Sequence, residues 1–423
     1  MNKEKKAGLL RQGAIVVLLI TAALLLGETG YFDGLRELLP ISASESRPGE
    51  AAPQNGQTQK PTDAVRPLTA VVCGSGGGRY GAAYHDETTM AVFRRFSADL
   101  GEALGSAGAP VGITEAEFCS RLRGSGVFFG FHCAQPLELL SGWLGTEMSG
   151  EAAGHRVQLL FLCAAGEQTE LCYRTETGEF FACATAAPAA GLSGRTEEYL
   201  PDGSCFAFEC GRLSAGDALT VIPAGQATAA VVKSAAMNPG EADIEELMRG
   251  VGMNSYVANS YTEADGTTVY VDETATLRVR ADGSIAFRRT ALPVNMGHVG
   301  LTGNVNSAWQ IAERCIGKNC GDAVLLFAGL GFDSTQDNCT VYLDYAVNGI
   351  PVRLASGHAA EIVVRFGSVV QLRLNCRTYT ATEETKTLLP MLQAAAIAAQ
   401  RDAEPKLIYA DRSDATDCIW VTD

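Results

Sequence analysis

The chain has 423 residues, of which 47% are hydrophobic and 19% are charged. Its formal net charge is −15, because 48 Asp and Glu outnumber 33 Lys and Arg. Hydrophobic content of this size supports real buried cores, and the length suits two or three domains. An acidic surface repels polyanions, so the charge argues against a nucleic-acid partner.

Residues 12 to 27 form an uncharged run of mainly Leu, Ile, Val and Ala. The run is short for the roughly 20 residues of a spanning helix, but it becomes long enough if the helix begins at Ala7 and Arg11 extends to the headgroups. Basic residues precede the run and acidic residues follow it. The positive-inside rule therefore predicts a cytoplasmic tail at 1–11, a single-pass anchor in the cell membrane at 12–27 and an extracytoplasmic remainder. A cleaved signal peptide and a buried core helix stay open as alternatives.

Small residues within this predicted anchor would let two membrane helices approach closely. They are Gly13, Thr21, Ala22, Ala23 and Gly27. We expect them to form the contact with a partner helix, if the anchor makes one. The alternative is that they are ordinary components of a membrane anchor.

Residues 28 to 66 are predicted to be a juxtamembrane segment followed by a stalk. From residue 42 onwards Pro, Gly, Gln and Ser dominate, and apolar residues are few. Such a segment buries too little apolar surface to offset the entropy of ordering it, so we expect disorder.

Residues 67 to 240 are predicted to form an N-terminal α+β domain. The expected elements are a strand at Leu68–Cys73, a helix at Glu87–Leu104, a short helix capped by Thr114, a strand at Val127–Cys133, a short helix at 137–145 and a hairpin tip at Thr177-Gly178. The cap is predicted because a Thr hydroxyl can accept from the first free amides of a helix.

Residues 241 to 300 are predicted to be a hairpin-rich central domain that follows a helix at Asp243–Arg249. Two alternating apolar and polar segments surround Asp265-Gly266 and Asp282-Gly283, and Asp-Gly between such segments is a strong hairpin signal.

Residues 301 to 423 are predicted to be a C-terminal α+β domain. Its expected elements are a helix at Val305–Cys315, several strands with a turn at Asn348-Gly349, a helix at Thr385–Gln400 and an edge strand at 406–412. Helices mixed with antiparallel hairpins indicate the α+β class for the whole ectodomain.

The glycine-rich stretch VVCGSGGGRYG contains the spacing G-x-G-x-x-G at Gly76, Gly78 and Gly81. A dinucleotide site also needs a βαβ unit and an acidic residue at the end of the second strand. The acids at a suitable distance, Asp99 and Glu102, fall inside the predicted helix, and no GK[ST] follows the glycines. We therefore expect no nucleotide site and interpret the loop as a flexible connection between stalk and fold.

Searches for catalytic patterns give no active site. The consecutive residues His85, Asp86 and Glu87 fit the acidic start of a helix better than a metal site, since they point in different directions. His132 and Cys133 could be a thiol and its base, but neighbours on a strand face opposite sides. H-E-x-x-H and G-x-S-x-G are both absent from the sequence.

Four acidic residues in the central hairpin region could flank a sugar, as paired carboxylates do in glycosidases. They are Glu263, Asp265, Asp272 and Glu273. Exposed turn acids are much more common, so the prediction is no catalytic, cofactor-binding or metal-ligating residue.

The 13 cysteines show no C-x-x-C spacing. Cys163, Cys172, Cys183, Cys339 and Cys376 lie in strand-like apolar runs, and the pairs Cys205/Cys210 and Cys315/Cys320 each enclose four residues. Buried free thiols are the expectation. One or two disulfides would form in an oxidising compartment, and their pairing stays open.

Several segments carry a family resemblance. They are RYGAAYHDETTMAVFRRFSADLGEALGSAG, TEAEFCSRLRGSGVFFGFHCAQPLELLSGWLG, VYVDETATLRVRADGSIAFRR, YAVNGIPV, EIVVRFGSVVQLRL, LLPMLQAAAIAA and LIYAD. In order and pattern these segments, behind a single N-terminal span, resemble the membrane-anchored YycH/YycI-type regulators of an essential two-component sensor kinase in Gram-positive bacteria. The resemblance covers most of the chain after the stalk and rests on no single invariant motif.

The resemblance implies a non-enzymatic role. It implies that anchor and ectodomain contact a sensor histidine kinase, together with a paired regulator of the same family, and so adjust cell-wall homeostasis. The long stalk and the many cysteines depart from the family pattern. Two alternatives stay open: an envelope module that binds a small molecule or wall polymer, and a divergent wall hydrolase that uses carboxylates around Glu263 and Asp265. None of these interpretations includes a cofactor or a nucleotide.

Overall fold

The computed structural model describes residues 64–210, 216–254, 258–290, 299–332, 338–401, 403–412 and 416–422. The predicted cytoplasmic tail and anchor lie outside these ranges, and so do Gly13, Thr21, Ala22, Ala23 and Gly27. None of the helices in the described ranges has the length and apolarity to cross a bilayer. All described residues belong to one compact unit, Gln59–Asp423.

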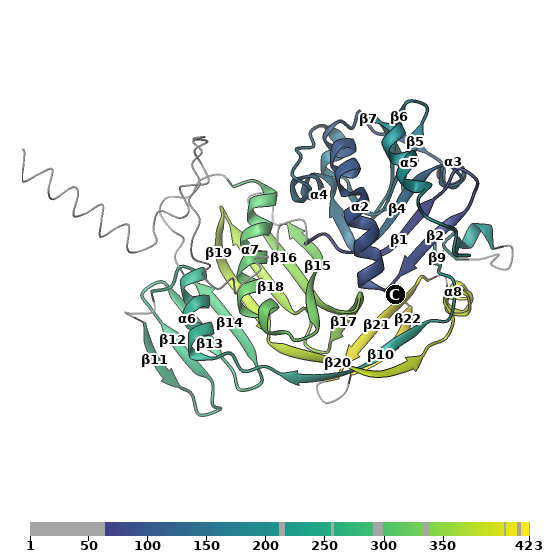
Figure 1. Cartoon of the computed structure of the whole chain (residues 1–423). Coiled ribbons are helices and arrows are strands. Elements are labelled where there is room, and N and C mark those ends of the chain that lie inside the picture. The colour runs from purple at the N-terminus through teal and green to yellow at the C-terminus, as the bar shows by residue number, and fades with distance from the viewer. Residues whose placement is uncertain are drawn as a thin grey trace, which may run out of the picture. The chain divides into compact units, whose positions relative to one another are not determined.

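The described residues form a mixed α+β fold with mostly antiparallel sheets, as the sequence predicts (Figure 1). The first sheet contains β1 (Pro67–Cys73), β2 (Arg79–Ala83), β3 (Val111–Ile113), β4 (Gly126–Pro136), β5 (Arg156–Ala165), β6 (Gln168–Thr175) and β7 (Phe180–Pro188). Its order is β2-β1-β4-β5-β6-β7-β3, and every pairing is antiparallel.

Strand alternation gives this sheet two apolar faces, because successive side chains point to opposite sides. One face, with Ala70, Val72, Phe129, Leu160 and Leu171, packs into the main core with α2 (Asp86–Gly105) and α4 (Leu137–Trp143). The other face, with Val71, Phe128, Phe161 and Cys172, packs into a smaller core with α3 (Glu115–Leu122) and the short hairpin β8 (Cys205–Phe206) and β9 (Val221–Ile222). The helix α5 (Ala189–Thr196) follows β7.

The second sheet has eleven strands. They are β11 (Asn259–Thr262), β12 (Thr268–Val271), β13 (Ala275–Val279), β14 (Ser284–Arg289), β15 (Ala323–Phe332), β16 (Asn338–Val347), β17 (Ile350–Leu354), β18 (Ala360–Arg365), β19 (Ser368–Asn375), β21 (Pro405–Asp411) and β22 (Thr416–Thr422). The order is β11-β12-β13-β14-β19-β18-β16-β17-β21-β22, with β15 on β16. The pair β17–β21 is parallel.

This sheet crosses the expected boundary at residue 300, because β14 pairs with β19. A separate ribbon joins β10 (Thr228–Ala236) to β20 (Arg377–Thr387), across the expected boundary at 240. The remaining helices are α6 (Glu241–Gly250), α7 (Leu301–Cys315) and α8 (Met391–Ala399). Independent folding of the three segments remains a prediction.

The fold also includes residues that the sequence assigns to the stalk. Ala64 and Val65 are buried in the main core, and Arg66 binds Asp86 with its guanidinium 3.0 Å from the carboxylate. The packed structure therefore begins before residue 67.

The predicted hairpin turns are confirmed. Asp265-Gly266 joins β11 to β12, Asp282-Gly283 joins β13 to β14, and Asn348-Gly349 joins β16 to β17. The three glycines have φ of 85°, 82° and 82°, the left-handed region that glycine enters without steric cost.

The prediction for the glycine-rich loop was partly wrong. The loop does not connect stalk to fold, because β1 precedes it and pairs with β2 on its far side. Gly74 closes the turn: its amide donates to the Gly78 carbonyl at 3.0 Å and its carbonyl accepts from the Gly77 amide at 3.1 Å. The glycines serve a hairpin turn within the sheet.

Two predictions near the C-terminal end were also wrong. Residues 385–387 extend β20, and the helix begins only at Met391, because Pro390 disfavours helical backbone in the residue before it. The strand at 406–412 is not an edge, since β21 lies between β17 and β22.

Candidate functional site

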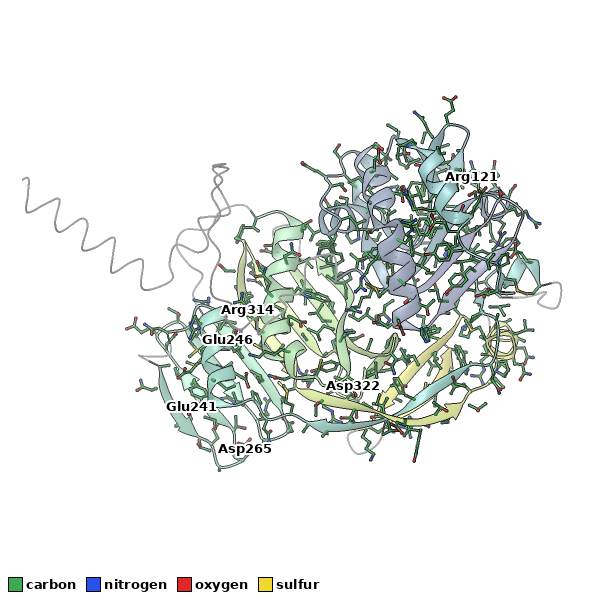
Figure 2. All side chains as sticks on the ribbon, viewed as in Figure 1. Arg121, Glu241, Glu246, Asp265, Arg314 and Asp322 are labelled. Carbon is green, nitrogen blue, oxygen red and sulfur yellow. A yellow bond between two sulfur atoms is a disulfide. The ribbon has the colours of Figure 1, made fainter. Side chains whose placement is uncertain are left out.

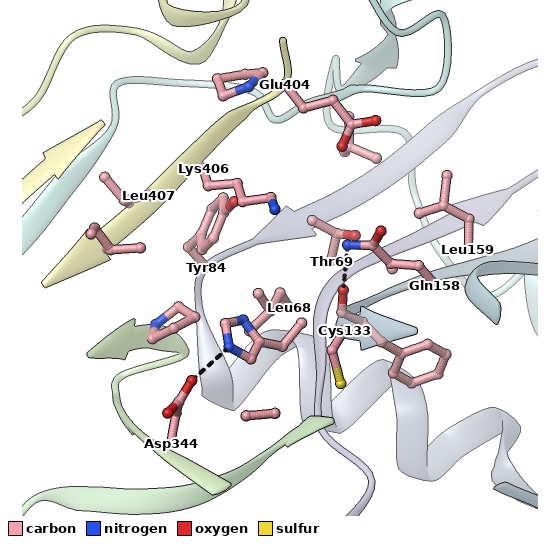
Figure 3. Close-up of a pocket in the computed structure, with 18 of the residues that line it drawn as sticks. Leu68, Thr69, Tyr84, Cys133, Gln158, Leu159, Asp344, Glu404, Lys406 and Leu407 are labelled. Atoms are coloured by element: carbon pink, nitrogen blue, oxygen red, sulfur yellow. Dashed lines mark hydrogen bonds and ion pairs between the residues drawn. The ribbon is translucent and has the colours of Figure 1, made fainter. Parts of the chain in front are cut away.

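A cavity of about 430 Å³ lies where β4 and β5 of the first sheet meet β16, β17 and β21 of the second (Figure 3). Its apolar wall includes Leu68, Phe128, Phe131, Leu159, Val352 and Leu407. Small-molecule sites are typically cavities of roughly 300–1,000 Å³ with mainly apolar walls and a few polar groups. The cavity fits that description.

One polar group of the cavity is Asp344 on β16 with two histidines. Its carboxylate lies 3.1 Å from Nε2 of His132, on β4, and 2.8 Å from Nδ1 of His358, in the loop before β18. Figure 3 shows Asp344 beside the cavity with one of its hydrogen bonds drawn. The Tyr342 ring lies 4.8 Å from the His358 ring, centroid to centroid. The contact between His132 and Asp344 joins residues that are 212 positions apart in the sequence.

The electrostatics of this group favour an ionised carboxylate. Burial raises the pKa of Asp344, but the hydrogen bonds and positive charge of the two histidines outweigh it, and the net pKa is lowered. The hydrogen bond to Asp344 in turn raises the pKa of His358 above the ordinary histidine value. The cavity therefore holds a fixed negative charge beside an imidazole that gains a proton readily.

A second polar group consists of Arg174 on β6 with two carboxylates. Nη1 of Arg174 lies 2.6 Å from Oδ2 of Asp217, and Nη2 lies 3.1 Å from Oε1 of Glu404, just before β21. Burial raises the pKa of Glu404, and its hydrogen bond with Asp217 raises it further. Burial opposes ionisation of Asp217 too, but the Glu404 hydrogen bond and the Arg174 charge lower its net pKa. The pKa values of the two carboxylates are therefore shifted in opposite directions.

Cys133 also lines the cavity, but its thiol is held in the protonated form. Sγ donates to the Phe327 carbonyl at 3.4 Å. Burial raises the pKa of Cys133, and the negative charge of Asp344 raises it further. Reactive cysteines have a lowered pKa in an electropositive setting, so this environment is the opposite of what a nucleophile needs.

The acidic residues of the central hairpins have local roles. Glu263 pairs with Arg278 at 3.1 Å, and Asp265 accepts from the Thr267 amide at 2.9 Å. Asp272 accepts from the Ala275 amide at 2.7 Å within its own turn. Figure 2 shows Asp265 at the far end of its hairpin. The structure therefore does not bring these carboxylates to the cavity.

The prediction that His85, Asp86 and Glu87 form the start of a helix is confirmed, with His85 as the N-cap of α2. Nδ1 of His85 accepts from the Thr88 amide at 3.4 Å and so caps α2. The neighbouring Asp86 is paired with Arg66. These residues stabilise the helix end and do not line the cavity.

Sequence reasoning missed most of the cavity's polar residues. They are Asp344, His358, Arg174, Asp217 and Glu404. A signal was present for Asp344, because it is the one charged residue of a largely apolar strand, CTVYLDYAV. Charged residues are seldom buried unless they are paired.

A further buried carboxylate, Asp411, joins three strands outside the cavity. It accepts from Arg377 Nε and Nη2 at 2.9 and 2.8 Å, from the Tyr379 hydroxyl at 2.9 Å and from Ser234 Oγ at 3.3 Å. Both carboxylate oxygens are used in this network, which indicates a structural role.

Cys205 and Cys210 form a disulfide, and the other eleven cysteines are free. Nine of the free thiols are buried, as the sequence predicts, and Cys119 and Cys133 are half-buried.

No protein-family model, no curated protein and no solved structure matches this chain. The cavity is therefore interpreted from its own geometry, and the resemblance to YycH/YycI-type regulators stays an expectation from the sequence.

Proposed function

We propose that the described part of the chain is a non-enzymatic binding module that holds a small molecule in the cavity between the two sheets. The observation that carries the proposal is that one cavity combines an apolar wall with two separate polar groups, around Asp344 and around Arg174. Figure 3 shows Asp344 and Glu404 far apart in the view, with Leu68, Tyr84 and Lys406 between them.

The arrangement of charges supports binding rather than catalysis. Each carboxylate of the cavity is already paired with a histidine or an arginine, and the thiol of Cys133 is protonated. The ligand that complements these walls is an amphipathic molecule with an apolar body and polar groups at both ends. Hydrogen-bonding ends would give specificity, and the apolar body would supply most of the binding free energy.

The proposal is tested with full-length protein purified from its native cells in detergent. The protein is denatured, and the released small molecules are identified and quantified by mass spectrometry. Leu159→Trp places a larger side chain in the cavity, whereas Leu389→Trp adds the same ring at an exposed position outside it.

We expect one compound in near-stoichiometric amount from the wild type and from Leu389→Trp, and its loss from Leu159→Trp. Melting curves of the two variants establish that both are folded. The proposal fails if no compound is recovered from the wild type, or if a folded Leu159→Trp protein retains it.

A second proposal concerns the role in the cell. Residues 12–27 would anchor the protein in the cytoplasmic membrane and hold the module outside the cell. There the module, together with a paired regulator, would regulate a sensor histidine kinase that controls cell-wall homeostasis. The support is the charge pattern of the N-terminus and the family resemblance. A ligand in the cavity would then bias this contact.

Crosslinking of tagged full-length protein in its native membrane tests this second proposal. A matched chain carries an unrelated span in place of residues 7–27. A sensor kinase that crosslinks to the native chain and not to the swapped chain supports the proposal, and recovery of wall material alone contradicts it.

A further inference from the structure

Two thiols and one carboxylate converge on the β5–β6 hairpin. The ligand atoms of Cys163, Glu170 and Cys172 all lie within 4.8 Å of one another. The register explains why: Cys163 lies directly opposite Glu170, and Phe161 lies opposite Cys172, so the three side chains share one face. In the described ranges this is the one cluster of His, Cys, Asp or Glu with metal-ligand spacing. None of its members lines the cavity between the sheets.

The distances suit a tetrahedral metal ion. Bonds of about 2.3 Å to sulfur and about 2.1 Å to oxygen place neighbouring sulfur and oxygen ligands roughly 3.6 Å apart. Cys172 Sγ lies 3.5 Å from Oε2 of Glu170. The Cys163 sulfur needs a shift of no more than about 1 Å to reach the roughly 3.8 Å separation of two sulfur ligands.

A disulfide between the same cysteines fits less well. Cys163 and Cys172 are diagonal neighbours across the two strands, because Cys163 lies opposite Glu170, which is two positions before Cys172. Diagonal positions are about 7–8 Å apart, whereas disulfide-linked Cα atoms are usually about 4.4–6.8 Å apart. An ion between the sulfur atoms spans this wider gap without movement of the strands.

Arg121 on α3 completes the charge balance. Its Nε lies 2.5 Å from Oε2 and its Nη2 lies 3.5 Å from Oε1 of Glu170. The three negative charges of two thiolates and one carboxylate equal the positive charges of a divalent cation and the arginine. The group is therefore neutral when it holds the cation. Such outer partners orient a ligand carboxylate and tune the ion.

The surroundings leave room for a fourth ligand. A metal ion binds cysteine in the thiolate form, so binding releases the two thiol protons. A cavity of about 310 Å³ adjoins Cys163, Glu170, Arg121 and Ser120 and has room for water in the open position.

We propose that Cys163, Glu170 and Cys172 bind one divalent transition-metal ion, with zinc preferred, while Arg121 positions Glu170 and water takes the fourth place. Thiolates and a carboxylate in tetrahedral arrangement select zinc over magnesium and calcium, which prefer oxygen ligands alone. The site is independent of the ligand cavity proposed above. The sequence alone predicts that Cys163 and Cys172 are buried free thiols.

Cobalt binding by reduced full-length protein in detergent tests the proposal. Cobalt(II) bound by thiolates absorbs in the near ultraviolet, and zinc should abolish that absorption at one ion per chain. We expect the absorption to be lost in Cys172→Ser and kept in Cys183→Ser. Cys183 is a matched control, since it is buried in the same sheet but packs into the core on the other face. Arg121→Gln should weaken binding about 10- to 100-fold.

A second measurement needs no variant. Zinc should protect Cys163 and Cys172 of the wild type from alkylation and leave the reactivity of Cys119 unchanged. The proposal is overturned if folded wild-type protein binds no cobalt, if Cys172→Ser binds it as well as Cys183→Ser does, or if peptide mapping finds Cys163 disulfide-bonded to Cys172.

Discussion

Asp411→Asn tests how far one buried carboxylate holds three strands together. Asp411 lies on β21, its partners Arg377 and Tyr379 lie on β20, and Ser234 lies on β10. The Asp411 side chain is 1% exposed and that of Arg377 is 13% exposed. The substitution keeps the shape but removes the charge, and it directs an amide donor at groups that are themselves donors.

The expected cost follows from this burial. Neutralising one member of a buried ion pair leaves its partner charged and desolvated, which costs about 3–5 kcal/mol. Counting hydrogen bonds gives a similar figure, since two lost bonds to a charged group cost about 1.5–3 kcal/mol each. Asp417 on β22 is the matched control. Its Lys386 ion pair is short, 2.5 Å, but the two side chains are 58% and 47% exposed. Asp417→Asn should therefore cost less than about 1 kcal/mol.

Urea unfolding of full-length protein, followed by tryptophan fluorescence, measures the difference. Trp420 lies on β22 with its ring centroid 6.0 Å from that of Tyr84, so its emission reports on this part of the fold. Similar losses in Asp411→Asn and Asp417→Asn would refute the view that the Asp411 network stabilises the junction.

Four further predictions concern the cavity and the local structure. His358→Gln should lower the free energy of unfolding by at most about 1 kcal/mol, because the His358 side chain is 40% exposed. The raised pKa of His358 in the folded protein means that this difference should be fully present below about pH 6.5 and should vanish as the pH rises through the folded pKa. Urea titrations of both proteins from about pH 5.5 to about pH 9 measure it. The pH dependence has the opposite sign for Asp344, whose pKa is lowered in the folded protein. The contribution of Asp344 to the free energy of unfolding should be fully present above about pH 4 and should be lost only as the pH falls through the lowered pKa. In thermal melts, Gly349→Ala should lower the melting temperature more than Gly266→Ala does. Both glycines have positive φ, but only at Gly349 would the new Cβ lie 2.7 Å from a backbone nitrogen. Thr114→Ala should cost about 1 kcal/mol in the same melts, and an unchanged melting temperature would contradict the capping box.

Local signals in the sequence predicted local structure well. Asn348-Gly349 forms its turn because both residues adopt the positive φ that a two-residue hairpin loop needs. Thr114 caps α3: its hydroxyl accepts from the Glu117 amide, and the Glu117 carboxylate accepts from the Thr114 amide. Where a local signal was misread, as at Thr385–Gln400, the pairing of β20 with β10 outweighed the helix propensity of the segment.

The candidate site could not be predicted in the same way. Arg174 and Glu404 are 230 positions apart, and only the packing of two sheets brings them together. His132 and Cys133 bond to different partners, the imidazole to Asp344 and the thiol to the Phe327 carbonyl, but both line the cavity, which simple strand alternation does not predict. The sequence could not show which strand lies beside these two residues, because the periodicity of one segment does not identify its partner.

The position of β21 has a consequence for the order of events during synthesis. Glu404, Lys406 and Leu407 form one wall of the cavity, and β21 joins the sheet through a parallel pairing with β17. The first sheet uses strands from Pro67 to Pro188 only, so a ribosome can release it to fold early. The cavity can close only after translation has passed residue 411. A nascent or truncated chain therefore contains every strand of the first sheet before it contains the complete wall of the cavity.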